Sequence, residues 1–379
     1  MREFGLETYF TEWEFKARYH MTASDAESMT LPTLLDMAEP QDREVYETLW
    51  LGYTETFGAP DLRALIAAQY PGLDASNILC LTGAQEGIYA AMKTLLTRDD
   101  HAIALVPNYQ ASETVPLDIC AVSGVTLRED RDWQVDLDSL AGAIRPNTKL
   151  ISINFPNNPT GATLKPDVYA ALIDLCRQHN CWLFSDEVYS GLELDPARRM
   201  EPAAIIYEKA ISLNGSSKAL GLPGLRIGWL ASRNIDVLHK INQYKNYLSI
   251  CCSGPSERLA VIALKASERI LARNRAIVSA NLDHLDAFFA DYPDLFEWQR
   301  PDGGCVAFPR YLGRDGADAF CHRALQEEGV LLIPPSLYHS DLLPTPTDRF
   351  RIGFGRRNTP DGLLALRQYV DRHRRRTAR

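Results

Sequence analysis

Lys218 is the residue whose type and surroundings point most directly to chemistry. It stands in the segment SLNGSSKALGLPGLRIGW, with Ser217 before it and Ala219 after it. Small neighbours let a bulky planar group approach the amine, and a lysine in such a place is a candidate Schiff-base nucleophile. The competing interpretation is an ordinary surface loop, so the decision depends on which other polar residues share the site.

Asp186, Tyr189 and Arg226 extend this candidate site. Asp186 ends an apolar stretch, so we expect its carboxylate to be partly desolvated and to need a cationic partner. Capping of the following helix is the alternative role for Asp186. Tyr189 follows closely enough to reach the same place, and Arg226 carries a guanidinium suited to a phosphate.

Asn158 and Arg351 add an amide and a second guanidinium. Asn158 lies in a proline-rich turn, where asparagine commonly serves the backbone conformation. Arg351 lies on the last predicted strand. Each residue is a weak signal alone, whereas their order and spacing together are informative.

The elements that must position these residues alternate between helices and short apolar strands. This pattern indicates an α/β architecture, with a sheet covered on both faces, in which ligands bind beyond the carboxyl ends of the strands. Polar segments follow three of the strands, at 154–161, 186–189 and 214–218. The pattern predicts helices over 85–96 and 167–179, and strands over 102–106, 149–155, 181–185, 210–213 and 226–231.

Composition excludes several classes of protein. The 379 residues carry a net charge of -9, which disfavours nucleic acid as a partner, and they contain no apolar run long enough to cross a membrane. The N-terminus lacks a secretory pattern, and the eight cysteines show no metal-ligand spacing, so we expect a cytoplasmic protein without a metal. We expect the Arg-rich end, 372–379, to be a disordered, solvated tail.

Seven segments together carry a family resemblance. In order they are GYTETFGAPDLR, TGAQE, PNY, NFPNNPTG, SDEVY, SSKALGLPGLRIGW and FRIGFGR. The chain resembles the fold-type I enzymes that use pyridoxal 5'-phosphate (PLP), specifically the class I/II aminotransferases. The resemblance implies a large domain (41–273) with a mostly parallel seven-stranded sheet covered by helices, and a smaller α+β domain (274–379). It also implies an N-terminal segment (1–40) that packs with the small domain.

The resemblance implies roles for the residues around the PLP ring. Lys218 matches the lysine that forms the internal aldimine and later moves the proton, and Asp186 matches the carboxylate that pairs with the pyridine nitrogen. Tyr189 and Asn158 match the groups that hydrogen-bond the ring 3′-oxygen. Tyr109 stands where the family places an aromatic ring against the cofactor.

The resemblance also implies the phosphate and substrate contacts. Phosphate binding is assigned to the turn of Gly83, Ala84 and Gln85, with Ser217 and Arg226. Tyr53 matches a tyrosine that reaches the phosphate of the neighbouring subunit, which implies a homodimer with shared sites. Arg351 matches the arginine that binds the substrate α-carboxylate, with Asn158 beside it.

Three departures from the family pattern leave specificity open. Gly215 replaces a frequent serine, IPPSLYH replaces a Pro-Gly turn, and TASDAESMT lacks the Asn-rich loop of many relatives. In that last segment Asp25 and Glu27 are candidates to face the substrate, where they would favour a cationic or polar side chain. A helix cap and a solvated loop are the alternative for both residues.

We therefore expect an aminotransferase that moves the amino group of an α-amino acid to a 2-oxo acid, through a Lys218 aldimine and a quinonoid. The same residues serve a lyase or cyclase that acts on an amino acid with a side-chain leaving group. A sensor that uses this fold without catalysis is disfavoured, because the first 40 or so residues show no helix-turn-helix pattern.

Overall fold

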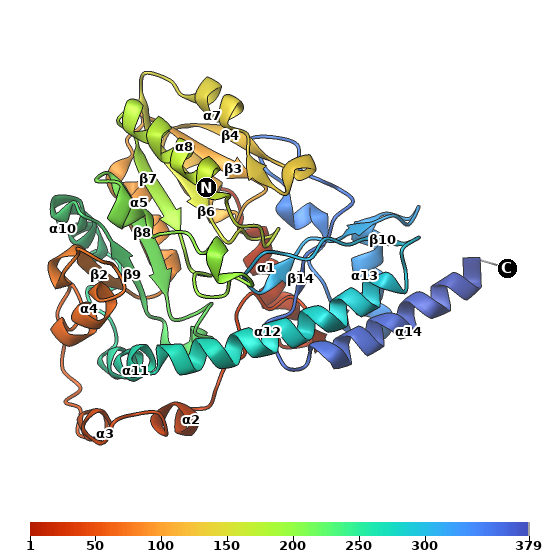
Figure 1. Cartoon of the computed structure of the whole chain (residues 1–379), viewed down its shortest axis with the longest axis horizontal. Coiled ribbons are helices and arrows are strands. Elements are labelled where there is room, and N and C mark those ends of the chain that lie inside the picture. The colour runs from red at the N-terminus through yellow and green to blue at the C-terminus, as the bar shows by residue number, and fades with distance from the viewer. Residues whose placement is uncertain (378–379) are drawn as a thin grey trace.

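The computed structural model describes residues 1–377, and Figure 1 shows their arrangement. A body built on one large sheet holds most of the chain, and the long helix α12 (Ser267–Ala290) runs from it towards a smaller group of elements. The smaller group contains α13 (Ala317–Glu328) and α14 (Thr359–Thr377). Within residues 1–377, no helix has the length and apolar character that spanning a membrane requires.

The large sheet has eight strands and is mostly parallel. Strands β9 and β5 run in the direction opposite to that of the other strands of this sheet. In spatial order the strands are β2 (Ile78–Leu81), β9 (Gly228–Ala231), β8 (Ala210–Gly215), β7 (Trp182–Asp186), β6 (Thr148–Asn154), β3 (His101–Val106), β4 (Ala121–Arg128) and β5 (Gln134–Val135).

The predicted fold class is confirmed, and the predicted count of seven strands is one too low. The additional strand, β5, has two residues and pairs with β4 after a turn in which Asp132 and Trp133 adopt positive φ. A strand this short has no alternation of apolar and polar residues to detect. The strand predicted over 226–231 begins two residues later, because Arg226 adopts a left-handed conformation, with φ of 53°.

Helices cover both faces of the sheet, as the near-continuous apolar strands require. On one face Leu183 and Ile151 pack against α7 (Leu137–Ala143) and α8 (Pro166–Gln178). On the other face the neighbouring residues Phe184 and Leu150 pack with three helices. These helices are α5 (Ala84–Leu95), α6 (Ala111–Leu117) and α10 (Ile235–Lys245).

The smaller group of elements is built around aromatic rings. Phe320 on α13 contacts four of them, with centroid distances between 4.4 and 5.7 Å: Phe296, Tyr311, Phe350 and Tyr369. The smaller group of elements also contains two short pairs of antiparallel strands: β10 (Phe296–Glu297) with β12 (Arg310–Tyr311), and β11 (Val306–Ala307) with β14 (Ile352–Gly353).

The Arg-rich end is helical as far as Thr377, so the prediction of a disordered tail is wrong for residues 372–377. Helix α14 continues through these residues because it packs against α13: Arg372 pairs with Glu328, and the ring of His373 lies 3.2 Å from the carboxylate of Glu327. Residues 378 and 379 lie outside the described part of the chain.

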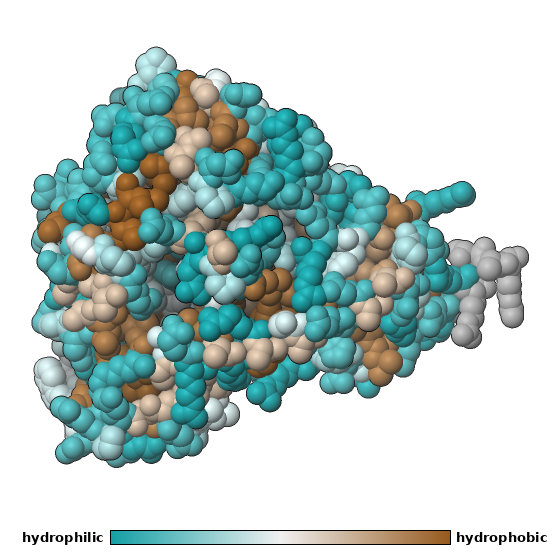
Figure 2. All heavy atoms as spheres, in the orientation of Figure 1, coloured by the Kyte–Doolittle hydropathy of each residue, from teal (hydrophilic) through white to brown (hydrophobic). Residues whose placement is uncertain are grey.

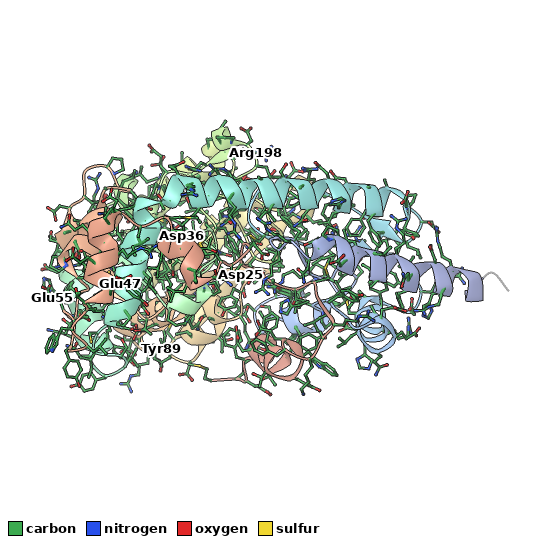
Figure 3. All side chains as sticks on the ribbon, turned by 90° about the horizontal axis from the view of Figure 1, so that it is seen from below. Asp25, Asp36, Glu47, Glu55, Tyr89 and Arg198 are labelled. Atoms are coloured by element: carbon green, nitrogen blue, oxygen red, sulfur yellow. The ribbon has the colours of Figure 1, made fainter. Side chains whose placement is uncertain are left out.

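The N-terminal segment joins the two groups of elements. Helix α1 (Gly5–Trp13) is followed by β1 (Tyr19–His20), which pairs in parallel with β13 (Val330–Leu331). Figure 3 follows the chain from Asp25, near the centre of the molecule, through Asp36 to Glu47 and Glu55 at the end away from α14. The helices on this path are α2 (Leu31–Leu35), α3 (Pro40–Glu47) and then α4 (Pro60–Ala67), and α2, α3 and α4 all contact α11 (Gly254–Lys265).

The aromatic packing around Phe320 predicts a large loss of stability on truncation. Phe320→Ala should lower the free energy of unfolding by about 3–5 kcal/mol, because the side chain is 1% exposed and its removal leaves a cavity. Urea unfolding measures this loss. Phe15→Ala is the control, since Phe15 is 93% exposed and should change stability by no more than about 0.5 kcal/mol. Equal effects of the two substitutions would contradict this account of the core.

Candidate active site

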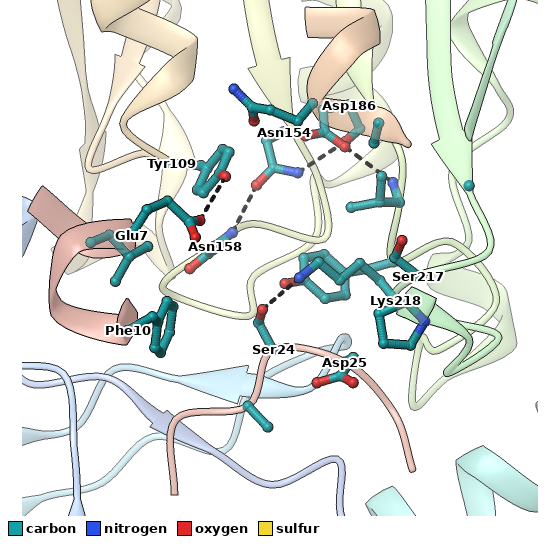
Figure 4. Close-up of a pocket in the computed structure, with 18 of the residues that line it drawn as sticks. Glu7, Phe10, Ser24, Asp25, Tyr109, Asn154, Asn158, Asp186, Ser217 and Lys218 are labelled. Atoms are coloured by element: carbon teal, nitrogen blue, oxygen red, sulfur yellow. Dashed lines mark hydrogen bonds between the residues drawn. The ribbon is translucent and has the colours of Figure 1, made fainter. Parts of the chain in front are cut away.

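A cavity of about 580 Å³ opens where the central strands of the sheet end, and Figure 4 looks into it. The carboxyl ends of β6, β7 and β8 lead into it, as expected for ligand sites in parallel sheets. Eleven residues predicted from the sequence line it: Asp25, Ala84, Gln85, Tyr109, Asn158, Asp186, Tyr189, Ser217, Lys218, Arg226 and Arg351.

Lys218 follows β8 through a short turn that brings its amine into the cavity. The amine donates a hydrogen bond to Oγ of Ser24 at 2.7 Å. Burial lowers the pKa of the Lys218 amine, and the nearby carboxylate of Asp25 opposes part of that shift. A lowered pKa leaves more of the amine uncharged and nucleophilic at neutral pH.

Asp186, the last residue of β7, is a buried carboxylate without a basic partner. Its Oδ1 accepts a hydrogen bond from the backbone N–H of Val188 at 3.2 Å, yet burial raises the pKa of Asp186 to about 6. The described part of the chain offers it no ion pair within 4.0 Å. A protonated pyridine nitrogen would supply the missing cation, so this residue fits PLP.

Tyr189 offers a second unsatisfied group. Its side chain is 2% exposed and lines the cavity, and its hydroxyl has no hydrogen-bond partner among the described residues. Buried hydroxyls are normally hydrogen-bonded, so this one is available to a ligand. Tyr109, also in the wall, packs against Phe4 with ring centroids 5.3 Å apart and donates to Glu7 at 3.3 Å.

Arg351 is a buried guanidinium held by neutral groups. It is 1% exposed, and it donates to Oδ1 of Asn158 at 3.0 Å, to the Tyr338 hydroxyl at 2.9 Å and to the Thr22 carbonyl at 2.8 Å. Among the described residues it has no carboxylate partner within 4.0 Å. A buried, unpaired guanidinium at the edge of a cavity favours binding of an external carboxylate.

Gly83, Arg226 and Gly228 shape the end of the cavity at the start of α5. A Cβ at Gly83 would lie 2.3 Å from Nη2 of Arg226, and one at Gly228 would lie 2.7 Å from the backbone nitrogen of Ala84. Only glycine permits this close approach of β9 to the helix. The N–H groups at the start of a helix, next to a guanidinium and the Ser217 hydroxyl, suit a phosphate.

Among the residues predicted for the site, Tyr53 and Glu27 lie away from the cavity, and Gly83 lies next to it. Gly83 precedes the lining residue Ala84 without lining the cavity itself. Tyr53 is 84% exposed on the surface. The Glu27 carboxylate accepts a hydrogen bond from the backbone N–H of Arg357 at 2.8 Å and does not line the cavity. Asp25 does line it, but Arg356 pairs with its carboxylate at 3.0 Å.

The sequence prediction missed most of the wall that the N-terminal segment supplies. This part of the wall contains Phe4, Leu6, Glu7, Phe10, Glu14, His20, Ala23 and Ser24. Ala23 and Ser24 lie within the quoted segment TASDAESMT, although neither was named. No motif marks the others, and the apolar spacing of Leu6 and Phe10 on α1 resembles that of any amphipathic helix. Asn154 and Arg356 were also missed, although they lie within the quoted segments NFPNNPTG and FRIGFGR.

The unpaired charge of Asp186 predicts a pH-dependent effect in the protein without PLP. The pKa of about 6 in the folded state exceeds the usual 3.8, so the stability of the fold falls as the pH rises from about 3.8 to about 6 and stays at the lower level above pH 6. Asp186→Asn should therefore exceed wild type in unfolding free energy by about 3 kcal/mol at pH 8 and by roughly half of that at pH 5. Urea unfolding at the two pH values tests this prediction, and a pH-independent difference would contradict it. Added PLP should reverse the order, because only the carboxylate pairs with a pyridinium.

Comparisons with known proteins agree with this geometry. The sequence profile of the family described as Aminotransferase class I and II matches residues 27–364. Capreomycidine synthase from Streptomyces vinaceus is 27% identical, over 98% of this chain and 94% of its own. Arginine–pyruvate transaminase from Pseudomonas aeruginosa is 30% identical, over 79% of this chain and 77% of its own.

A solved structure extends the likeness to the fold. The PLP-dependent aminotransferase from Streptococcus suis superposes with a TM-score of 0.89 and 31% identity, over 98% of both chains. The profile match covers both the sheet and most of the smaller group of elements. The chain belongs to the class I and II aminotransferase family of PLP-dependent enzymes.

Proposed function

We propose that the protein is an aminotransferase that moves the amino group of an α-amino acid to a 2-oxo acid. The observation that carries the proposal is the meeting of three groups in one cavity: the Lys218 amine, the unpaired Asp186 carboxylate and the unpaired Arg351 guanidinium. When bound, PLP supplies an electron sink for the charge left at the substrate Cα.

The residues proposed to hold PLP divide between its ring and its phosphate. Lys218 would bond the cofactor aldehyde and Asp186 would pair with the ring nitrogen. Tyr189 and Asn158 would hydrogen-bond the 3′-oxygen, and Tyr109 would pack against the ring. The residues that would hold the phosphate are Ala84, Gln85, Ser217 and Arg226 in the cavity wall, with Gly83 beside them.

Arg351 and Lys218 are proposed to act on the substrate itself. Arg351 binds the α-carboxylate, and its fixed position, with Asn158 beside it, orients the Cα–H bond. The Lys218 amine takes the Cα proton and later returns it to the neighbouring carbon. The lowered pKa of this amine suits it to act as a base near neutral pH.

The N-terminal wall supports a preference for amino donors with a basic side chain. Glu7 and Glu14 line the cavity, and no lysine or arginine among the described residues lies within 4.0 Å of either. His20 is 3.7 Å from Glu14, but burial lowers the pKa of that imidazole, which keeps it neutral. Arginine, which is named in the description of the arginine–pyruvate transaminase relative, has a basic side chain of this kind.

A cyclase is the second candidate function. The capreomycidine synthase relative matches 98% of this chain, more than the arginine–pyruvate transaminase does. Both reactions begin with removal of the Cα proton, so Lys218, Asp186 and Arg351 serve either one. In a cyclase or lyase, the charge left at Cα expels a leaving group from the substrate side chain.

A homodimer with shared sites is proposed from the exposed apolar surface. Trp50 and Leu51 are each 81% exposed, Tyr53 is 84% exposed, and Tyr247 is 90% exposed. Figure 2 shows that hydrophobic residues also gather in patches on one face of the sheet-containing body. Large exposed apolar side chains mark interaction surfaces.

The eight free thiols suit the reducing cytoplasm, which we propose as the compartment.

Absorbance spectroscopy of the PLP-loaded protein tests the proposed reaction. Wild type should show a visible or near-ultraviolet band, and Lys218→Ala should lose the band of lysine-bound PLP. A panel of basic, neutral and acidic amino acids should convert that band to the amine form of the cofactor, with arginine or lysine among the fastest.

The products of the same assay separate the two candidate functions. An oxo acid together with an aminated acceptor supports transfer, whereas ammonia or a cyclic product contradicts it and supports the cyclase. Failure to bind PLP at all would overturn both. Faster reaction with glutamate than with arginine would overturn the preference for basic donors.

Mixing of two inactive variants tests the shared sites. If Tyr53 serves the cavity of the partner subunit, a dimer of one Tyr53→Ala subunit and one Lys218→Ala subunit contains one intact site. That site combines Lys218 of the first subunit with Tyr53 of the second. Random exchange of subunits should then recover up to about a quarter of wild-type activity. Each variant alone is the control. No recovery from a mixture shown by sedimentation to contain mixed dimers would contradict the shared site.

A further inference from the structure

Ser24 makes the one hydrogen bond that the Lys218 amine forms with the described residues. The amine donates to Oγ of Ser24 at 2.7 Å, and Figure 4 shows the two side chains meeting across the cavity. Ser24 comes from the N-terminal segment, far from Lys218 in sequence. The carboxylate of Asp186 and the hydroxyl of Tyr189 line the same cavity, yet the amine bonds to neither, and the Ser24 side chain also lies beside the Tyr189 hydroxyl.

The backbone around Ser24 is fixed on both sides. Before it, the Thr22 carbonyl accepts a hydrogen bond from Arg351 at 2.8 Å. After it, the Ala26 N–H donates to the Lys218 carbonyl at 3.0 Å, and the Asp25 carboxylate pairs with Arg356 at 3.0 Å. The position of the Ser24 hydroxyl is therefore set relative to Lys218.

A hydroxyl suits a lysine that changes its protonation state. The Ser24 oxygen accepts a hydrogen bond from an ammonium group, and its O–H donates to the lone pair of a neutral amine. A carboxylate would instead stabilise only the charged form. The lysine side chain is long and flexible, so without a partner its amine would sample several positions.

We propose that Ser24 is a positioning residue that holds the Lys218 amine whenever this amine is not bonded to the cofactor. Ser24 thereby sets the rate at which Lys218 moves the proton at the substrate Cα. This inference rests on the proposed role of Lys218 as the base, and it applies equally to amino transfer and to cyclisation.

Paired substitutions at Ser24 separate the hydroxyl from the volume of the side chain. Thr keeps the hydroxyl and Val, of nearly the same shape, lacks it. In the PLP-loaded enzyme, Ser24→Val and Ser24→Ala should lower kcat roughly tenfold or more and change KM little, while Ser24→Thr retains most of the activity. Ser28→Ala, at an exposed serine of the same segment, is the matched control.

Two further readouts report on the amine itself. With an α-deuterated donor, the isotope effect on kcat should rise in Ser24→Ala, because proton transfer becomes more rate-limiting. In cofactor-free protein, the band of lysine-bound PLP should form more slowly after PLP is added to Ser24→Ala than to wild type or Ser28→Ala.

The outcomes distinguish this inference from the proposed function. Unchanged kcat and isotope effect in Ser24→Ala and Ser24→Val, with normal PLP capture, would overturn the role of Ser24 while the enzyme remains a transaminase. A raised KM with unchanged kcat would also overturn it, since that pattern indicates substrate binding. Wild type without a PLP band would overturn the proposed function instead.

Discussion

The buried charge of Asp186 is the constraint on which the site depends. Asp186 is the last residue of β7, so its carboxylate lies at the carboxyl edge of a sheet that is covered on both faces. The side chain is buried there and largely shielded from solvent. Among the described residues it has one long backbone hydrogen bond and no ion pair. The fold therefore carries an electrostatic cost that a cationic ring would compensate, and cofactor binding and folding stability would then be coupled through one side chain.

The N-terminal segment connects Arg351 and Lys218, two basic residues that line the cavity. Its backbone accepts a hydrogen bond from Arg351 through the Thr22 carbonyl, and two positions later its side chain meets the Lys218 amine. Arg351 belongs to the smaller group of elements and Lys218 follows a strand of the large sheet. The segment therefore sets the position of Arg351 relative to Lys218, although neither residue lies in it.

The sequence predicted the residues that carry the family motifs, and it missed most of the wall that the N-terminal segment supplies. Lys218 and Asp186 stand at strand ends with unusual neighbours, so their placement in the cavity could be anticipated. Ser24 lies in a segment that the sequence singled out, but nothing marked the serine itself, and Glu7 had no signal at all, because a serine in a loop and a glutamate on an amphipathic helix have no local signature of contact with residues far away in the chain. The short β5 escaped detection for a related reason, since two residues cannot display a period.

The glycine contacts beside α5 have a consequence for how this enzyme can diversify. At Gly83 and Gly228 no added side chain fits, so this end of the cavity tolerates almost no change. The opposite wall consists largely of side chains on α1 and the loop after it, and one of them, Leu6, is also part of the core of the large sheet. Substitutions at Glu7 and Glu14, which line the cavity outside that core, are therefore the changes that could alter its lining while leaving both the sheet and the glycine contacts intact.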